Sequence, residues 1–320
     1  MSNLTKIWLI VAGSLVLVGI LAFVLVMCVM CWDFASLSTV KYESNSHETV
    51  EEFNNISLSS DTAHIQFLPS DDEKCKVECY EDVKAKHSVK VNNGTLEINQ
   101  VNEKKWYDYI GINISSQKIT VYLPKAEYKS LTVKSSTGRV ELSEDFNFEN
   151  VDISVSTGDV RCYSSVSENL KIKTSTGYIV LGNISAGALD LRASTGSINA
   201  SNVVCLGDFK IEVSTGRVNL SDVECKNLIS SGDTGDITVK NVICSEKFNI
   251  NRSTGDVKLE ACDAAEIFVV TDTGDVEGTL LSQKVFIAKT DTGSIDVPNS
   301  IEGGRCEITT DTGDIKISVQ

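Results

Sequence analysis

Aspartate side chains recur in the C-terminal half of the sequence, on both sides of a repeated Thr-Gly dipeptide. Carboxylates that return at the same place in successive repeats could share calcium ions, because Ca²⁺ prefers oxygen ligands. The candidates for such a site are Asp233, Asp236, Asp272, Asp275, Asp291, Asp311 and Asp314. The alternative is that these aspartates, and the serines before threonine in earlier repeats, cap a turn by accepting hydrogen bonds from backbone amides. The residue before threonine changes from serine to aspartate toward the C-terminus, so the aspartates of the last repeats are the ones to test first.

The Thr-Gly dipeptide itself returns ten times, at intervals of 19 or 20 residues. The ten glycines are Gly138, Gly158, Gly177, Gly196, Gly216, Gly235, Gly255, Gly274, Gly293 and Gly313. A fixed period near twenty residues is typical of a solenoid, in which each unit buries its apolar face only by stacking on its neighbours.

The residues around each glycine predict how one coil of this solenoid is built. Apolar residues alternate with polar ones before the glycine, as at Leu189 and Leu191, and again after it, as at Ile198. The apolar positions are two residues apart on each side of the dipeptide, but this alternation does not continue across it. The glycine must therefore form a corner rather than continue a strand. A second corner is expected six residues later, where turn-forming side chains stand at Asn183, Asn202, Asp222 and Asn241. We therefore expect an all-β fold: a three-sided, single-stranded β-solenoid of about ten coils over residues 131–320.

Residues 53–130 contain short β segments without the twenty-residue period and are expected to form a β-rich cap with irregular early coils. Asn93-Gly94 is typical of a two-residue hairpin turn. Residues 33–52 read as a linker. At the other end, the repeat Asp311–Gln320 is expected to be the last coil and to leave an open edge that could associate end to end.

An aromatic cluster of Trp106, Tyr107 and Tyr109 lies in the expected cap, beside Lys104 and Lys105. Such a cluster could stack on sugar rings or form an interface. The alternative is a loop folded over the end of a coil.

Residues 7–32 contain no charged side chain and are long enough to cross a bilayer as a helix. We expect an uncleaved, single-pass transmembrane anchor preceded by a short tail, residues 1–6. Lys6 precedes the span and Asp33 follows it. This places the tail in the cytoplasm and the C-terminal domain outside it, according to the positive-inside rule.

Charge and cysteine usage restrict the partners. The net charge of −15 disfavours nucleic acid and anionic lipid as partners. Cys205, Cys225 and Cys244 occupy the same place in successive repeats, and we expect a column of buried free thiols. A zinc site in the repeats is disfavoured, because all three histidines, at 47, 64 and 87, precede them.

The repeated Ser-Thr-Gly-Asp-Val/Ile phrase follows a β-rich section that ends in Val121-Tyr122-Leu123-Pro124. This arrangement resembles the bacterial putative-adhesin family of β-repeat proteins, a domain of unknown function. The resemblance implies an envelope-associated β-repeat protein and brings no catalytic residues and no cofactor.

The function expected from these features is non-catalytic adhesion or binding at the cell membrane, with a protein or glycan ligand. An enzyme is disfavoured because the constant repeat spacing leaves no room for a loop that could carry a site. The repeats also contain no histidine. The alternative function is a structural or sensory cell-envelope protein that self-assembles or relays the state of the envelope to membrane partners.

Overall fold

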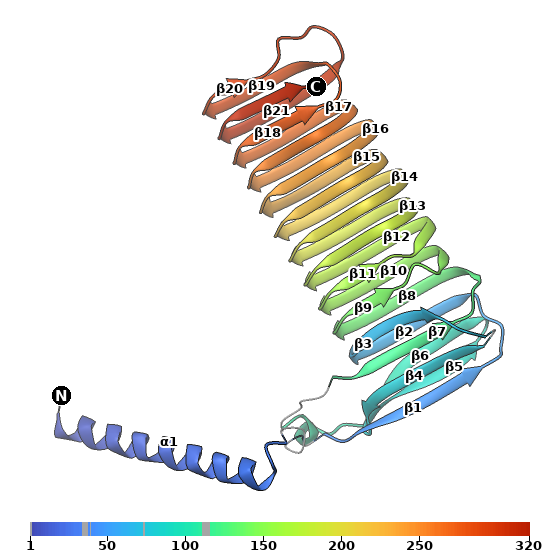
Figure 1. The fold of residues 1–320 in the computed structure, drawn as a ribbon, viewed down its shortest axis with the longest axis vertical. Helices are drawn as coiled ribbons and strands as arrows, with labels where there is room; N and C mark the ends of the chain where they lie inside the picture. Colours follow the sequence, from blue (N-terminus) through green and yellow to red (C-terminus); the bar gives the residue numbers. More distant parts are fainter. Residues whose placement is uncertain (1, 34–37, 39, 73, 111–115) are drawn as a thin grey trace.

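The computed structural model describes residues 2–33, 38, 40–72, 74–110 and 116–320. These residues form an elongated stack of β coils with one α-helix, α1 (Asn3–Val29), at the N-terminal end (Figure 1). The expected all-β solenoid of about ten coils, preceded by one apolar helix, is confirmed.

The solenoid is built from strands that pair in parallel with the equivalent strand of the next coil. They are β8 (Glu127–Thr137), β9 (Val140–Leu142), β10 (Asn147–Thr157), β11 (Val160–Cys162), β12 (Ser165–Thr176), β13 (Ile179–Thr195), β14 (Ile198–Thr215), β15 (Val218–Thr234), β16 (Ile237–Thr254), β17 (Val257–Thr273) and β18 (Val276–Leu280). Equivalent residues stack in register, so Ile179 pairs with Ile198 and Ile198 with Val218. The apolar positions of every coil therefore form continuous columns inside the stack.

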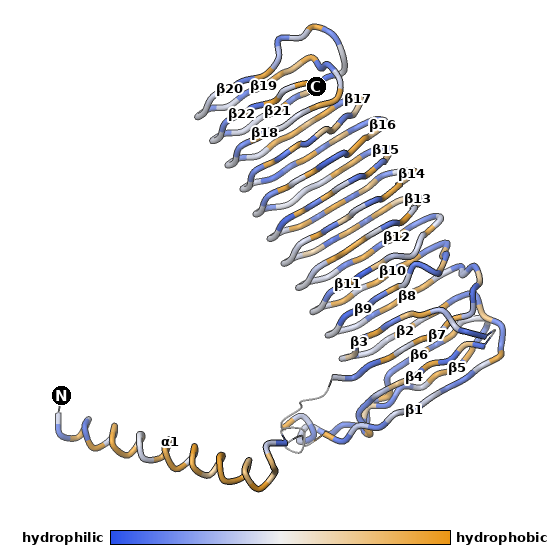
Figure 2. Tube along the Cα trace, in the orientation of Figure 1, coloured by the Kyte–Doolittle hydropathy of each residue, from blue (hydrophilic) through white to orange (hydrophobic). Residues whose placement is uncertain are grey.

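The core follows from this stacking. In the coil around Gly196, alternate side chains such as Ile198, Phe209 and Val213 are fully or almost fully buried. Polar residues between them face solvent, and the alternation of hydropathy recurs along each coil (Figure 2). Burial on one face at a spacing of two residues is what a strand at a solenoid wall requires.

Glycine forms the first corner of each coil. The ten repeat glycines have φ between +128° and +153°, a backbone conformation essentially restricted to glycine. They also stack closely, since a Cβ added to Gly216 would lie 1.6 Å from the carbonyl oxygen of Gly196. The dipeptide is therefore needed both for its backbone conformation and for its lack of a side chain.

The second corner lies where the sequence predicts it. Four residues there adopt left-handed φ values of 51° to 55°, namely Asn183, Asn202, Asp222 and Asn241. A third bend follows, where the register shifts between Ala186 and Leu189 and again between Cys205 and Asp208. These three changes of direction divide each coil into three short sides.

The C-terminal end differs from the expected order of coils. β17 pairs with β21 (Gly304–Thr312) and not with β19 (Lys284–Thr292), and β21 in turn pairs with β19. In the same way β22 (Ile315–Val319) lies between β18 and β20 (Ile295–Asp296). The expectation that the last repeat forms the open end is therefore wrong. The chain skips one coil position, makes the terminal coil, and returns through residues 297–303 to fill the gap (Figure 1).

An additional coil lies at the other end. β2 (Asn55–Thr62) and β3 (His64–Pro69) stack in register on β8 and β9, with Thr62 opposite Thr137. Ala63 takes the place of the corner glycine, and the preceding Asp61-Thr62 matches the later Asp-Thr-Gly phrases.

Antiparallel strands then close the stack. β4 (Cys75–Asp82) joins β1 (Tyr42–Thr49) to β7 (Lys118–Leu123), and β7 extends β3. The hairpin of β5 (Ala85–Asn92) and β6 (Thr95–Asn102) extends β2 and turns at Asn93-Gly94, as predicted.

Candidate functional site

A lateral groove of about 650 Å³ runs across the early coils, on the side that lies between the second corner and the third bend. It forms because the inward column there changes from aromatic to small side chains: Tyr128 and Phe148 are followed by Val166 and Ala186. The groove is lined by Glu127, Tyr128, Asn147, Phe148, Glu149, Ser165, Val166, Ser167, Ser185, Ala186, Val204 and Leu206. Five neighbouring strands, β8, β10, β12, β13 and β14, thus contribute to a single surface.

The groove combines a rigid floor with an apolar rim. The rings of Tyr128 and Phe148 are buried with centroids 5.7 Å apart, and the Tyr128 hydroxyl donates to the carbonyl oxygen of Pro124 at 2.8 Å. Burial raises the pKa of Tyr128. On the rim, Leu206 is 78% exposed and Val204 42%. Exposed aliphatic side chains beside a preformed floor can bind an apolar group without rearrangement.

The lining of the groove includes serines and glutamates but no histidine, cysteine or lysine. A serine nucleophile needs a neighbouring base, and this surface supplies none other than the two exposed carboxylates.

The aspartates after the corner glycine form a ladder along the stack. Asp275 Oδ1 accepts from the backbone N–H of Asp314 at 2.7 Å, and Asp314 Oδ1 accepts from that of Ser294 at 2.7 Å. Asp236 and Asp256 make the same contact with the next coil. The hydrogen bonds from Ser294 hold the pKa of Asp314 below its ordinary value. These contacts are the ones that the amide-capping alternative requires.

The aspartates before threonine lie on the other side of the corner. Asp272, Asp311 and Asp291 follow one another in space because of the reordered coils, and all are exposed. Asp233 lies further along the stack, and Asp291 forms an ion pair of 3.2 Å with Lys289. Calcium binding by these residues stays a prediction.

Three further potential ligands meet in the cap. Atoms of Cys79, Glu81 and His87 lie within 4.8 Å of one another and are buried. Glu81 accepts from the backbone amide and Nδ1 of His87, at 2.7 and 2.6 Å, and from Asn45. His87 Nε2 lies 3.1 Å from Ser60 Oγ. Burial raises the pKa of Cys79 to about 12.

These hydrogen bonds satisfy both ring nitrogens of His87. A metal would have to displace the contact between Glu81 and His87, so we assign the cluster to the joining of β4, β5 and β2. The sequence alone did not predict this cluster, because all three histidines precede the repeats and no pattern of the repeats includes them. The Cys-Tyr-Glu spacing followed by histidine in the next strand was the available signal.

The repeat cysteines are buried in one column, as expected. Cys205 pairs with Cys225, and Cys225 with Cys244, and the last two Sγ atoms lie 3.3 Å apart. No disulfide is present among the described residues.

Comparison with known protein families shows to which family this chain belongs. The Toastrack DUF4097 family model matches residues 53–207 and again residues 204–320. The chain belongs to the Toastrack DUF4097 family. The expected resemblance to an adhesin-like β-repeat family of unknown function is thereby confirmed, and the Toastrack region includes the lateral groove and both aspartate columns.

Solved structures similar to this Toastrack chain include three from Bacteroides and Parabacteroides species. A protein of Bacteroides fragilis described as a putative adhesin has 14% identity and a TM-score of 0.46, over 87% of this chain and 97% of that one. A putative adhesin of Parabacteroides merdae has 12% identity and a TM-score of 0.49, over 75% and 97%. A putative lipid binding protein of Parabacteroides distasonis has 16% identity and a TM-score of 0.41, over 88% and 98%. None of the three is described as an enzyme. No curated protein matches the chain.

Proposed function

We propose that this protein is a membrane-anchored, surface-displayed module that binds a protein or glycan ligand without catalysing a reaction. The observation that carries this proposal is the lateral groove, an apolar recess on a rigid β-solenoid.

The anchor in this proposal is α1. It has 27 residues with a mean hydropathy of 3.0 over its most apolar window, so its length and composition suffice to cross a membrane. At 1.5 Å per residue it extends about 40 Å. Lys6 at its start and Asp33 after its end favour a cytoplasmic N-terminus. The solenoid would then project from the outer surface of the membrane.

The groove favours a ligand with an apolar group. Leu206 and Val204 are exposed on its rim, whereas the aromatic rings of the floor are covered and cannot stack on a sugar face. The serine hydroxyls and the carboxylates of Glu127 and Glu149 add hydrogen-bond partners along its length. A protein segment that inserts an aliphatic side chain beside Leu206 fits this surface best.

Single substitutions on the rim test the proposal. Full-length protein in proteoliposomes would be assayed for retention on cells, on matrix proteins and on a glycan array. We expect Val204→Glu and Leu206→Glu to weaken retention about tenfold or more, because a carboxylate cannot be desolvated cheaply beside an apolar ligand.

The matched control is Ile243→Glu. Ile243 occupies in its coil the position that Val204 occupies in the groove, eight residues after the corner glycine, here Gly235. It is 39% exposed but lies outside the groove. Equal loss in the control, or no retention of the wild-type protein on any of the surfaces, contradicts binding through the groove.

The terminal coil supports a second candidate function, end-to-end assembly of a structural or sensory envelope protein. Phe286, Ala288 and Val297 are only partly buried there, and Ile295 is 46% exposed. Among the described residues, no strand pairs with the outer edge of β19 and β20. An unpaired edge with partly exposed apolar side chains is a template for pairing with another chain.

Sedimentation in detergent separates the two functions. Concentration-dependent association that is lost in Ile295→Lys supports assembly, because an added charge at an edge opposes pairing. If the protein is monomeric at all concentrations, end-to-end assembly is excluded. The proposed binding through the groove is not affected by that result.

A further inference from the structure

We propose that the aromatic segment Trp106–Ile110 of the cap is a second membrane contact, which lies in the lipid–water interface of the bilayer that holds α1. This juxtamembrane patch consists of Trp106, Tyr107, Tyr109 and Ile110 together with Lys105. The inference rests on the proposed anchoring of the chain by α1.

The exposure of the patch is the first observation. η2 (Trp106–Tyr109) is a short 3-10 helix in which no residue is buried. Trp106 is 76% exposed, Tyr109 63% and Tyr107 48%, and Ile110 after them is 68% exposed. Four adjacent large side chains with this exposure are unusual for a surface that faces only water. Amphipathic rings of tryptophan and tyrosine are enriched at the headgroup level of membranes.

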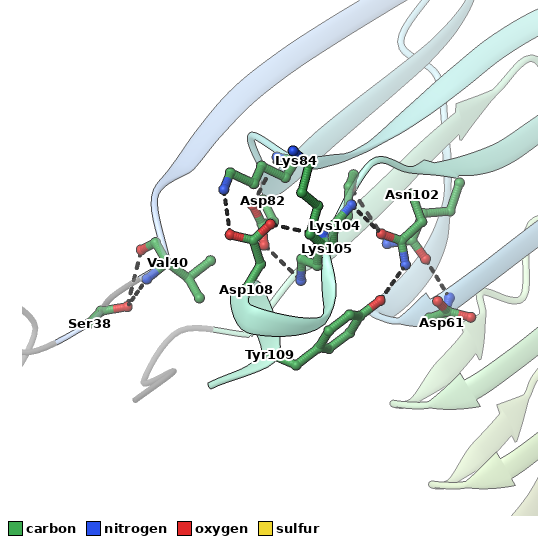
Figure 3. Close-up of polar contacts among 12 residues, drawn as sticks. Ser38, Val40, Asp61, Asp82, Lys84, Asn102, Lys104, Lys105, Asp108 and Tyr109 are labelled. Atoms are coloured by element: carbon green, nitrogen blue, oxygen red, sulfur yellow. Dashed lines mark hydrogen bonds and ion pairs between the residues drawn. The ribbon is translucent and has the colours of Figure 1, made fainter. Parts of the chain in front are cut away.

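The patch is held in a fixed shape. Asp108 accepts from Lys84 Nζ at 2.5 Å and from the Lys105 amide at 2.9 Å. The Tyr109 hydroxyl accepts from Asn102 Nδ2 at 2.9 Å (Figure 3). The rings are therefore presented by a preformed turn, and little conformational entropy remains to be lost on contact.

Two acidic side chains at the patch are paired with lysines, although the whole chain carries −15. Asp82 is paired with Lys104 at 2.7 Å and Asp108 with Lys84 at 2.5 Å. Lys105 lies with its Nζ 5.9 Å from the centre of the Tyr107 ring. A lysine beside exposed rings can reach lipid phosphates while its alkyl chain stays in apolar surroundings.

The position of the patch identifies the occupant as the membrane. Val40 and Lys41 share a hollow of about 410 Å³ with Tyr107, Asp108 and Ile110. The Lys41 carbonyl also accepts from the Val83 amide at 3.0 Å, which fixes the start of the domain beside η2.

Only seven residues lie between Trp32, at the end of the apolar segment, and Val40, so their Cα atoms are eight residue steps apart. Even fully extended, eight residues span no more than about 29 Å. The patch therefore cannot move far from the bilayer surface, whatever path the connecting residues take.

Tryptophan fluorescence tests the proposal, because the chain has only three tryptophans, Trp8, Trp32 and Trp106. The variant Trp8→Phe/Trp32→Phe keeps the indole of the patch, and Trp32→Phe/Trp106→Phe keeps one in the anchor. The control adds Tyr178→Trp to a chain in which all three tryptophans are replaced by phenylalanine. Tyr178 is 53% exposed and lies on the solenoid, after the corner at Gly177.

Each full-length variant is reconstituted into phosphatidylcholine vesicles with and without brominated acyl chains, after circular dichroism has shown that it is folded. We expect Trp106 to be quenched about half as strongly as Trp8 or more, because interfacial indoles lie near the top of the acyl chains. Its emission should move to shorter wavelength than that of the Tyr178→Trp control, which should not be quenched.

The outcomes separate this inference from the anchoring on which it rests. Quenching of Trp8 without quenching of Trp106 overturns the membrane contact and leaves the anchor intact. A blue-shifted but unquenched Trp106 also overturns it, since the patch is then covered by protein. Absence of quenching at Trp8 overturns the anchor and the patch together.

Discussion

Arg252 occupies the space that Gly232 leaves in the preceding coil. The two residues are paired in register, and a Cβ on Gly232 would lie 1.8 Å from Arg252 Nη1. The Arg252 side chain is fully buried, and Nη1 donates to the Val213 carbonyl at 2.9 Å. Its Nε and Nη2 find no partner within the described chain. Burial lowers the pKa of Arg252, and the charge of nearby Asp233 opposes this shift only in part.

A buried cation with so few partners should destabilise the solenoid. We expect Arg252→Met to raise the free energy of unfolding by about 1–3 kcal/mol, because it removes the charge and keeps most of the volume beside Gly232. Urea unfolding measures this. Arg217→Met, at an exposed arginine, is the control and should change stability by less than about 0.5 kcal/mol. A clear loss of stability in Arg252→Met would show that the guanidinium is well solvated inside the coil.

Substitution of a corner glycine is expected to destabilise the solenoid strongly, whereas substitution of Gly182 is not. We expect Gly216→Ala to cost about 3 kcal/mol or more, because it combines a strained φ of +145° with a contact of 1.6 Å to the Gly196 oxygen. In contrast, Gly182→Ala should cost less than about 1 kcal/mol, since its Cβ would meet only side chains, the Tyr163 ring at 3.3 Å and Ser201 Oγ at 3.8 Å, and no backbone atom within 3.8 Å. Thermal and chemical unfolding of both variants would decide. Similar costs at the two sites would refute the role assigned to the corner.

Buried thiols predict a loss of stability at alkaline pH. Burial raises the pKa of Cys205 to about 11, from an ordinary value of 9.0, and the pKa of Cys162 and Cys306 to about 12. Above pH 9 the unfolded chain loses these protons before the folded chain does, so the free energy of unfolding must fall as pH rises. Each thiol contributes a slope of up to about 1.4 kcal/mol per pH unit, which for Cys205 ends near pH 11.

Cys205→Ala isolates one such thiol, because Ala186 and Ala264 fill the same place in other coils. We expect the variant to lose less stability between pH 9 and 11 than the wild-type protein does. The measurement is urea unfolding at a series of pH values. Parallel pH profiles for the two proteins would mean that the thiol of Cys205 is not shielded from water in the folded state.

The aspartate ladder can be tested without a structure of a complex. Asn keeps the acceptor oxygen of Asp, so Asp275→Asn/Asp314→Asn should retain the amide contacts but lose the charge that strengthens them. We expect this variant to be slightly less stable than the wild-type protein, because the lowered pKa of Asp314 means that the folded state favours its carboxylate. Asp275→Ala/Asp314→Ala should lose more stability, because the amides then lose their acceptor.

The same pair of variants tests calcium. If the carboxylates act only as amide acceptors, millimolar calcium leaves the melting temperature of the wild-type protein unchanged relative to EDTA. A rise with calcium but not with magnesium, abolished in Asp275→Asn/Asp314→Asn, would instead establish the calcium site.

The repeat determined most of the coil by itself. The interrupted alternation of apolar and polar residues around Gly196 predicted a corner there, and the turn-forming side chain of Asn202 predicted the second corner. These features follow from local rules, because a side chain alternates between faces and only particular residues tolerate positive φ. The single apolar segment was equally evident from composition.

The order of coils and the surfaces between them depended on tertiary structure. Ile267 pairs with Cys306, thirty-nine residues later, although Phe286 stands at the same place in the nearer repeat. Either apolar residue can stack on Ile267 in the buried column, so the periodic pattern cannot distinguish the two possible orders of the coils. The lateral groove and the contact between Glu81 and His87 likewise unite residues from several strands. Local alternation fixes which face of a strand is buried, but only the packed stack decides which strand covers it.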